Sequence, residues 1–232
     1  MEILAIVVGF FFSVIYTTEA IGFYLRGVGN KYGLPSLGYS LHIQFSVLSR
    51  TFALFALPMI GFMLDSRVDV KTILIIPISC SIFFVFLFYF LYFKNISESL
   101  TEWLFCVYLK KFHNKYQSPI DVSENREKIS VQQQSRIFVS SGLAFFIISF
   151  GTFAVFIAAS IFPAYRASIL QSTTLFTGVG TYISTFYLDP KVSTLIDSGL
   201  EYAPIVKAVY LSRLISLIFT LLICLVIAWQ FK

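Results

Sequence analysis

An arginine lies near the middle of a stretch that is apolar enough and long enough to cross a bilayer. Arg50 stands within residues 39–65, YSLHIQFSVLSRTFALFALPMIGFMLD, roughly 16 Å along a helix from Tyr39. At that depth in a bilayer an arginine costs at least about 2.5–3.5 kcal/mol, and it normally faces a protein interior or a wet cavity where it has a partner. The partner is either a carboxylate of the same protein or an anion that the protein handles.

Glu19 is the carboxylate best placed to be that partner. It lies in the first apolar stretch, about 9 Å before Leu25, and Arg50 is deeper by only about 7 Å at the same helical rise. If the first two helices are neighbours, an ion pair between Glu19 and Arg50 is sterically reasonable. Such a pair either holds the two helices together or belongs to a functional site, since ionisable residues inside membranes are functional candidates by default.

Cations outnumber acidic residues at membrane depth. Glu19 is the one clearly intramembrane carboxylate, whereas several basic residues lie within apolar stretches or at their ends. This imbalance favours an exogenous anion such as a phosphate or pyrophosphate headgroup, to which arginine offers a bidentate fork. The candidate residues for binding it are Arg26, Arg50, Arg166, Lys207 and Arg213.

Polar side chains recur along one face of the stretch 168–188. Gln171, Thr174, Gly178, Thr181 and Thr185 are three or four residues apart, which is the spacing of one helix face. Small and hydroxyl residues at this spacing commonly hold bilayer helices together. A continuous polar stripe can equally line a hydrated path, and both interpretations stay open.

The patterns that catalysis or metal binding would need do not occur. His42 and His113 are isolated, with no histidine–carboxylate spacing that suggests a metal site. The sequence also lacks a glycine-rich phosphate loop and, on the loops expected in the cytoplasm, the paired acidic motif that Mg²⁺-dependent prenyl-phosphate enzymes need. Three widely separated cysteines are typical of small apolar residues, not of a disulfide framework. We therefore expect neither an enzyme nor a metal or other cofactor.

The elements that must position these residues are membrane helices. The chain is 57% hydrophobic and 12% charged, with several apolar runs near 20 residues, which predicts an all-α polytopic membrane protein with a single domain, 1–232. Small residues in the fourth span should allow close helix approach, and Asp189-Pro190-Lys191 should end the fifth. The six predicted spans are about 3–25, 39–64, 71–93, 136–162, 168–188 and 206–229.

The one long connection, 94–135, contains an amphipathic pattern at about 98–116. Its apolar residues have helical spacing but are too few to span a bilayer, which predicts an interfacial helix. Ser130 and Gln133 have the spacing of a capping box that would start the fourth helix before it enters the membrane.

Basic residues outside the spans are unevenly distributed between the two sides. With six spans, eleven fall on the side of the 94–135 connection and four on the other, so the first side is expected to be cytoplasmic and both termini outside. The formal charge of +5 comes from these residues and indicates membrane lipids, not nucleic acid, as partners.

Two blocks of the sequence resemble the alternate lipid II flippase family, the six-span "alternate to MurJ" (Amj) proteins of bacteria. The first block runs from YLRGVGNKYG (24–33) into FSVLSRTFALFALPMIGFMLD (45–65), with Ser49-Arg50-Thr51 and a closing Asp65. The second is FPAYRASILQSTTLFTGVGTYISTFYLDPK (162–191). Residues 71–136 are similar to the family in hydropathy alone.

The resemblance implies translocation of a polyprenyl-pyrophosphate-linked peptidoglycan precursor, lipid II, across the bacterial cytoplasmic membrane, which serves cell wall biogenesis and cell shape. Under this hypothesis Arg26 and Lys31 capture the headgroup at the inner face. Arg50, released from Glu19, holds it at mid-depth, and Arg166 receives it at the outer face. The residues expected to meet its sugars are Gln171, Thr174 and Thr181.

Other classes of function fit the same residues. A membrane-embedded enzyme acting on a lipid phosphate would need acidic metal ligands. A scaffold for envelope synthesis would tolerate changes at Arg50 and Glu19, and a small-anion channel would conduct. A homodimer is compatible with so small a transporter, but no motif decides the oligomeric state or the energy source.

Overall fold

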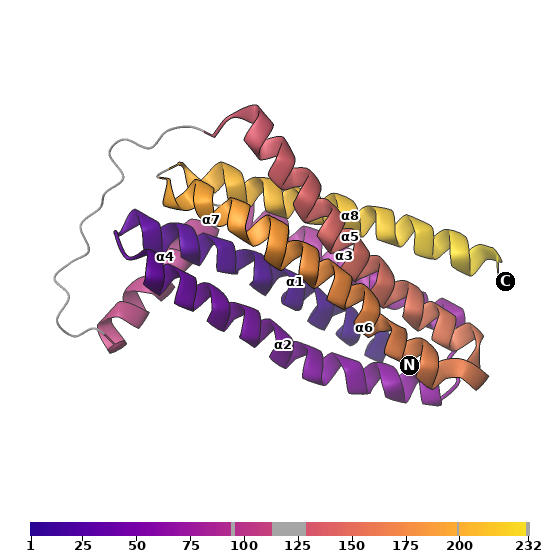
Figure 1. Cartoon of the computed structure of the whole chain (residues 1–232). Helices are drawn as coiled ribbons and strands as arrows, with labels where there is room; N and C mark the ends of the chain where they lie inside the picture. Colours follow the sequence, from indigo (N-terminus) through magenta and orange to yellow (C-terminus); the bar gives the residue numbers. More distant parts are fainter. Residues whose placement is uncertain (94–95, 113–128, 199, 231–232) are drawn as a thin grey trace.

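The computed structural model describes residues 1–93, 96–112, 129–198 and 200–230. In this part of the chain nearly every residue is helical and no strand occurs. Five helices are long and apolar enough to cross a membrane, and Figure 1 shows them side by side with both chain termini at one end of the bundle. The predicted all-α polytopic fold is confirmed. The five are α1 (Glu2–Lys31), α2 (Pro35–Asp65), α3 (Val70–Phe93), α5 (Val131–Ile161) and α8 (Tyr202–Gln230).

The predicted span 168–188 differs from the other five. It is divided between α6 (Arg166–Ile183) and a π-helical segment (Ser184–Leu188), and α7 (Asp189–Asp197) follows without a break. The prediction that Asp189-Pro190-Lys191 ends this helix is wrong, because Pro190 lies in the first turn of α7, where a missing N–H is tolerated. The three segments form one rod along the side of the bundle (Figure 1).

The α1–α2 hairpin forms the most extensive helix pair. Its helices approach most closely at two glycines: a Cβ added to Gly38 would lie 2.8 Å from the Cα of Gly29, and one added to Gly29 would lie 2.5 Å from the Cα of Gly38. Any larger residue would force the two backbones apart there. Towards the rest of the bundle α2 makes a short contact with α5, a hydrogen bond from the Gln44 amide to the Tyr108 hydroxyl, and an ion pair between Asp65 and Arg166 of α6.

Helix α5 holds the other half of the bundle by packing on α8 and on α6. Ser149 and Thr220 share a buried hydrogen bond of 2.9 Å, and the Ser216 hydroxyl donates to the carbonyl oxygen of Gly142 at 2.8 Å. The predicted close approach through small residues of this span is confirmed. The predicted capping box is also present, since Ser130 and Gln133 cap the start of α5 reciprocally.

A further helix, α4 (Ile96–Phe112), packs on α1 and α3 at the end of the bundle opposite the termini (Figure 1). It buries Phe105 and Leu109, while Trp103 keeps 60% of its surface exposed. This helix corresponds to the predicted interfacial helix 98–116, of which residues 113–116 lie outside the described part of the chain.

Candidate functional site

A polar hollow lies inside the bundle, between α2 and the α6–α7 rod. Its volume is about 190 Å³, and it contains the charged side chains of Glu19, Arg50, Asp189 and Arg213. Hydroxyls of Thr181 and of its neighbours on the rod line the opposite wall. The remaining lining residues are Phe23, His42, Ser46, Ser141, Ala144, Phe145, Ile148, Ser184, Thr185 and Leu188.

A second hollow of about 430 Å³ continues from the first towards the end of the bundle where α1 terminates. It is lined by Arg26 and Tyr39 at that end and by Ser193 of α7. The two hollows have His42, Ser46, Arg50, Thr185 and Asp189 in common. We call the two hollows together the central groove. It runs from mid-bundle to the Arg26 end.

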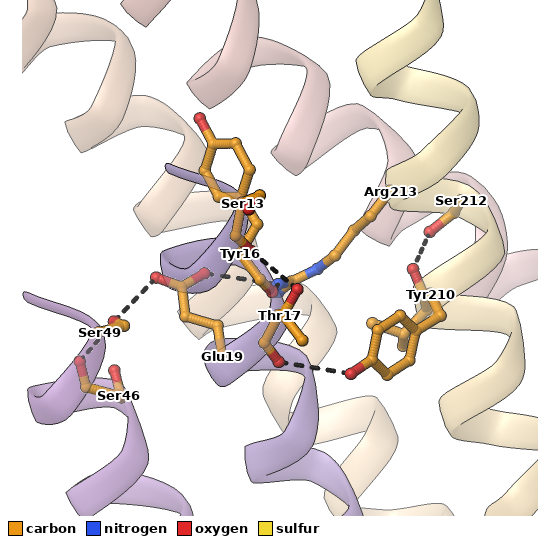
Figure 2. Close-up of polar contacts among 10 residues, drawn as sticks. Ser13, Tyr16, Thr17, Glu19, Ser46, Ser49, Tyr210, Ser212 and Arg213 are labelled. Atoms are coloured by element: carbon orange, nitrogen blue, oxygen red, sulfur yellow. Dashed lines mark hydrogen bonds and ion pairs between the residues drawn. The ribbon is translucent and has the colours of Figure 1, made fainter. Parts of the chain in front are cut away.

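Glu19 pairs with Arg213, not with Arg50. The Arg213 guanidinium donates from Nη1 to Glu19 Oε2 at 3.4 Å and to the carbonyl oxygen of Tyr16 at 3.2 Å (Figure 2). On the other side, the Ser49 hydroxyl lies 3.4 Å from Glu19 Oε1. The predicted Glu19–Arg50 ion pair is therefore wrong. One residue along a helix turns the side chain by about 100°, so Ser49 faces Glu19 while Arg50 is directed elsewhere.

Arg213 is buried and held by several contacts. The residue is only 6% exposed, and its guanidinium carbon lies 5.3 Å from the centre of the Phe145 ring. Its Nε has no hydrogen-bond partner, which leaves one buried donor at the edge of the groove. An unsatisfied donor on a guanidinium favours the arrival of an anionic acceptor.

Arg50 is exposed and lines both hollows. Among the described residues, none forms an ion pair or a side-chain hydrogen bond with its guanidinium. The first hollow therefore contains one arginine with a carboxylate partner, Arg213, and one without, Arg50.

Arg26 closes the wider end of the groove. Its guanidinium lies 3.8 Å from Asp197 of α7 and 5.0 Å from the centre of the Tyr39 ring. The neighbouring Asn30 side chain donates to the carbonyl oxygen of Ile196. These contacts tie the end of α7 to α1, so Arg26 lines the second hollow with part of its charge already balanced.

The other predicted cations lie outside the groove. Lys31 forms an ion pair with Glu102 of α4 at 2.6 Å, and Arg166 forms one with Asp65 at 3.2 Å. Lys207 is exposed on α8. None of these three lines either hollow. The structure thus brings together Arg26, Arg50 and Arg213 out of the predicted set.

The predicted polar path is divided in the same way. Thr181 lines the first hollow, and Thr185 lines both. Gln171 and Thr174, nearer the start of α6, line neither. The groove therefore uses the later part of the polar stripe.

Sequence reasoning missed His42, Ser46 and Asp189. The side chain of His42 has a buried Nδ1 without a hydrogen-bond partner and packs against Gly22, where a Cβ would lie only 2.6 Å from that nitrogen. A signal was present, because His42, Ser46 and Arg50 are four residues apart and so share one face of α2.

A family model described as "Amj: Alternate to MurJ" matches residues 68–229. This range includes Asp189, Arg213 and the second block of the resemblance, 162–191, together with the middle of the chain. It begins after the first block, so Arg26 and Arg50 lie before it. Neither a curated protein nor a solved structure matches the chain.

Proposed function

The chain belongs to the Amj family, described as alternate to MurJ, and from this premise we propose that it is a flippase for lipid-linked peptidoglycan precursor in the bacterial cytoplasmic membrane. It would move the precursor from the inner to the outer leaflet, where the precursor is used for cell wall synthesis. The chain acts as a transporter, not as an enzyme, in this proposal.

The observation that carries the proposal is the unpaired Arg50 in the central groove. A bilayer-depth arginine without a carboxylate is costly, so a protein that retains one is expected to supply it with an anion during its work. A diphosphate matches the planar fork of the guanidinium with two parallel hydrogen bonds. The second hollow, about 430 Å³, lies within the range of about 300–1,000 Å³ typical of small-molecule sites.

The edge of the groove supports a lipid-linked substrate. Ile43 and Val47 of α2 line the second hollow and are 45% and 57% exposed. On the rod, Phe186 and Tyr187 follow the groove residue Thr185 in the chain and are 62% and 54% exposed. A polyprenyl chain can therefore stay in the hydrocarbon beside the groove while the diphosphate and sugars occupy the polar interior.

The proposed direction of transport rests on the position of the groove. The hollows extend from Arg50 to Arg26, at the end of the bundle that is expected in the cytoplasm from the loop charges. At the opposite end of the bundle, outside the groove, the Arg166–Asp65 ion pair joins the start of α6 to the end of α2. In our proposal, the headgroup is admitted on the Arg26 side and leaves when the Arg166–Asp65 contact opens.

Complementation tests this proposal directly. In cells depleted of every other precursor flippase, expression of the chain should restore growth and precursor in the outer leaflet, and Arg50→Ala should abolish both at normal protein abundance. Lys71→Ala, which removes an exposed cation at the far end of the bundle, is the matched control. Restored growth by Arg50→Ala would instead favour the scaffold alternative, and absence of outer-leaflet precursor with the intact chain would refute transport.

A further inference from the structure

A separate groove lies between α5 and the side of α7 that faces away from the central groove. It has a volume of about 320 Å³ between the first turns of α5 and α7. Its polar lining consists of Gln133, Arg136, Lys191 and Thr194, and its apolar lining of Ile137, Pro190 and Leu195. Nothing in the proposed transport path uses it.

The available polar groups of this groove are donors. Among the described residues, no carboxylate pairs with Arg136 or Lys191, and both side chains are exposed. The Gln133 side-chain oxygen is engaged in the capping box, which leaves the amide nitrogen to donate. The Thr194 hydroxyl donates to the carbonyl oxygen of Pro190. Two cations and an amide around one hollow call for an anionic ligand.

The surface beside the groove is apolar. Val139 and Leu143 follow Arg136 at three and seven residues, so they lie on the same face of α5. They are 63% and 52% exposed. An exposed apolar stripe that begins at a cation has the layout of a phospholipid: a phosphate at one end and acyl chains along the helix.

We propose that Arg136, Lys191 and Gln133 bind the phosphate of an anionic membrane phospholipid, whose acyl chains lie along Val139 and Leu143. A soluble phosphate would gain nothing from the apolar stripe. The site does not depend on the flippase proposal. The site does involve α7, because Pro190 lines both this groove and the central one. A bound lipid would therefore stabilise the packing of α7, which forms one side of the central groove, against α5.

Native mass spectrometry of the purified full-length chain tests the site. Phosphatidylglycerol should be retained at one site about tenfold more tightly than phosphatidylcholine, because each basic residue near an anionic headgroup adds measurably to binding. Arg136→Gln/Lys191→Gln should remove this preference. The control, Arg67→Gln/Lys71→Gln, removes two exposed cations at the opposite end of the bundle and should leave the preference unchanged.

The proposal would be overturned by equal retention of the two lipids, by an unchanged preference in the Arg136/Lys191 variant, or by an equal loss in the control. Displacement of the lipid by millimolar inorganic phosphate would assign the site to a soluble anion instead. Should the double variant unfold early in a thermal scan, Lys191→Gln alone, at an exposed position, must still weaken phosphatidylglycerol retention. The charge-preserving variant Arg136→Lys/Lys191→Arg must keep it.

Discussion

Arg50 of α2 and Arg213 of α8 line the same hollow, but only Arg213 has a carboxylate that balances its charge. Arg213 is buried, anchored to the Tyr16 carbonyl and balanced by Glu19. Arg50 is exposed to the groove and has no such partner among the described residues. In our proposal, Arg213 therefore helps to build the groove, and Arg50 binds the headgroup that enters it.

The largest effect should come from the unpaired arginine. Arg50→Ala removes the main ligand for a diphosphate, and we expect transport to fall about 100-fold or more, since losing one partner of a desolvated charged pair costs several kcal/mol. Arg50→Lys should recover little, because lysine lacks the fork. Outer-leaflet precursor measures transport, and thermal unfolding in detergent should show both variants as stable as the parent chain.

Equal loss of stability and transport in Arg50→Ala would contradict the comparison, since it would make Arg50 a structural residue like Arg213.

Arg213→Ala should show the opposite pattern, with stability affected first. It leaves the Glu19 carboxylate without its cation, and because Glu19 is partly accessible the expected cost is about 1–3 kcal/mol, below the value for a fully buried pair. Removing both charges in Arg213→Gln/Glu19→Gln should recover part of that loss. A thermal unfolding series of the two single variants and the double variant gives the coupling directly. If the stability losses of the two single variants simply add up in the double variant, the 3.4 Å contact between Glu19 and Arg213 contributes nothing to stability.

The ion pair at the far end of the bundle from Arg26 allows a further test of the proposed path. If Arg166–Asp65 is the closure on the release side, a cross-link between Asp65→Cys and Arg166→Cys should block transport and leave headgroup binding intact. Because Asp65 is highly exposed, Asp65→Asn should change stability by no more than about 1 kcal/mol. Continued transport by the cross-linked protein, verified by mass spectrometry of the intact chain, would remove this contact from the mechanism.

The fold followed from the sequence because its signals are local. Apolar runs near 20 residues located five helices, and the Ser130–Gln133 spacing located the start of α5. The rod made of α6 and α7 was predicted less well. Its polar residues and Pro190 are ordinary signs of a helix end, and only the packing of the rod on α5 and the π-helical turn before Asp189 allow the helix to continue.

The site was predicted only in part because it depends on which helices meet. The sequence shows that Glu19 and Arg50 lie at similar depths in the membrane, which is why an ion pair between them was predicted. It does not show in which direction each side chain points around its helix axis. In the structure, the orientation of α1 points the Glu19 side chain at Arg213 on the last helix, almost 200 positions later in the chain. The same limitation separated Thr181, which lines the groove, from Gln171 and Thr174, which share its stripe but line neither hollow.

The smallest expected effect on transport comes from the polar residues of α6 and the π-helical segment, of which Thr181 and Thr185 line the groove whereas Gln171 and Thr174 do not. Thr181→Val/Thr185→Val keeps side-chain shape but removes two hydroxyls from the groove, and transport should fall about threefold to tenfold, as for the loss of one or two neutral hydrogen bonds. Gln171→Leu/Thr174→Val, the matched pair outside the groove, should stay within about twofold of the parent chain in the same outer-leaflet assay. If instead the second pair proves the more damaging, the substrate path runs along the start of α6 towards Arg166, as the sequence alone indicated, and the central groove is only one part of it.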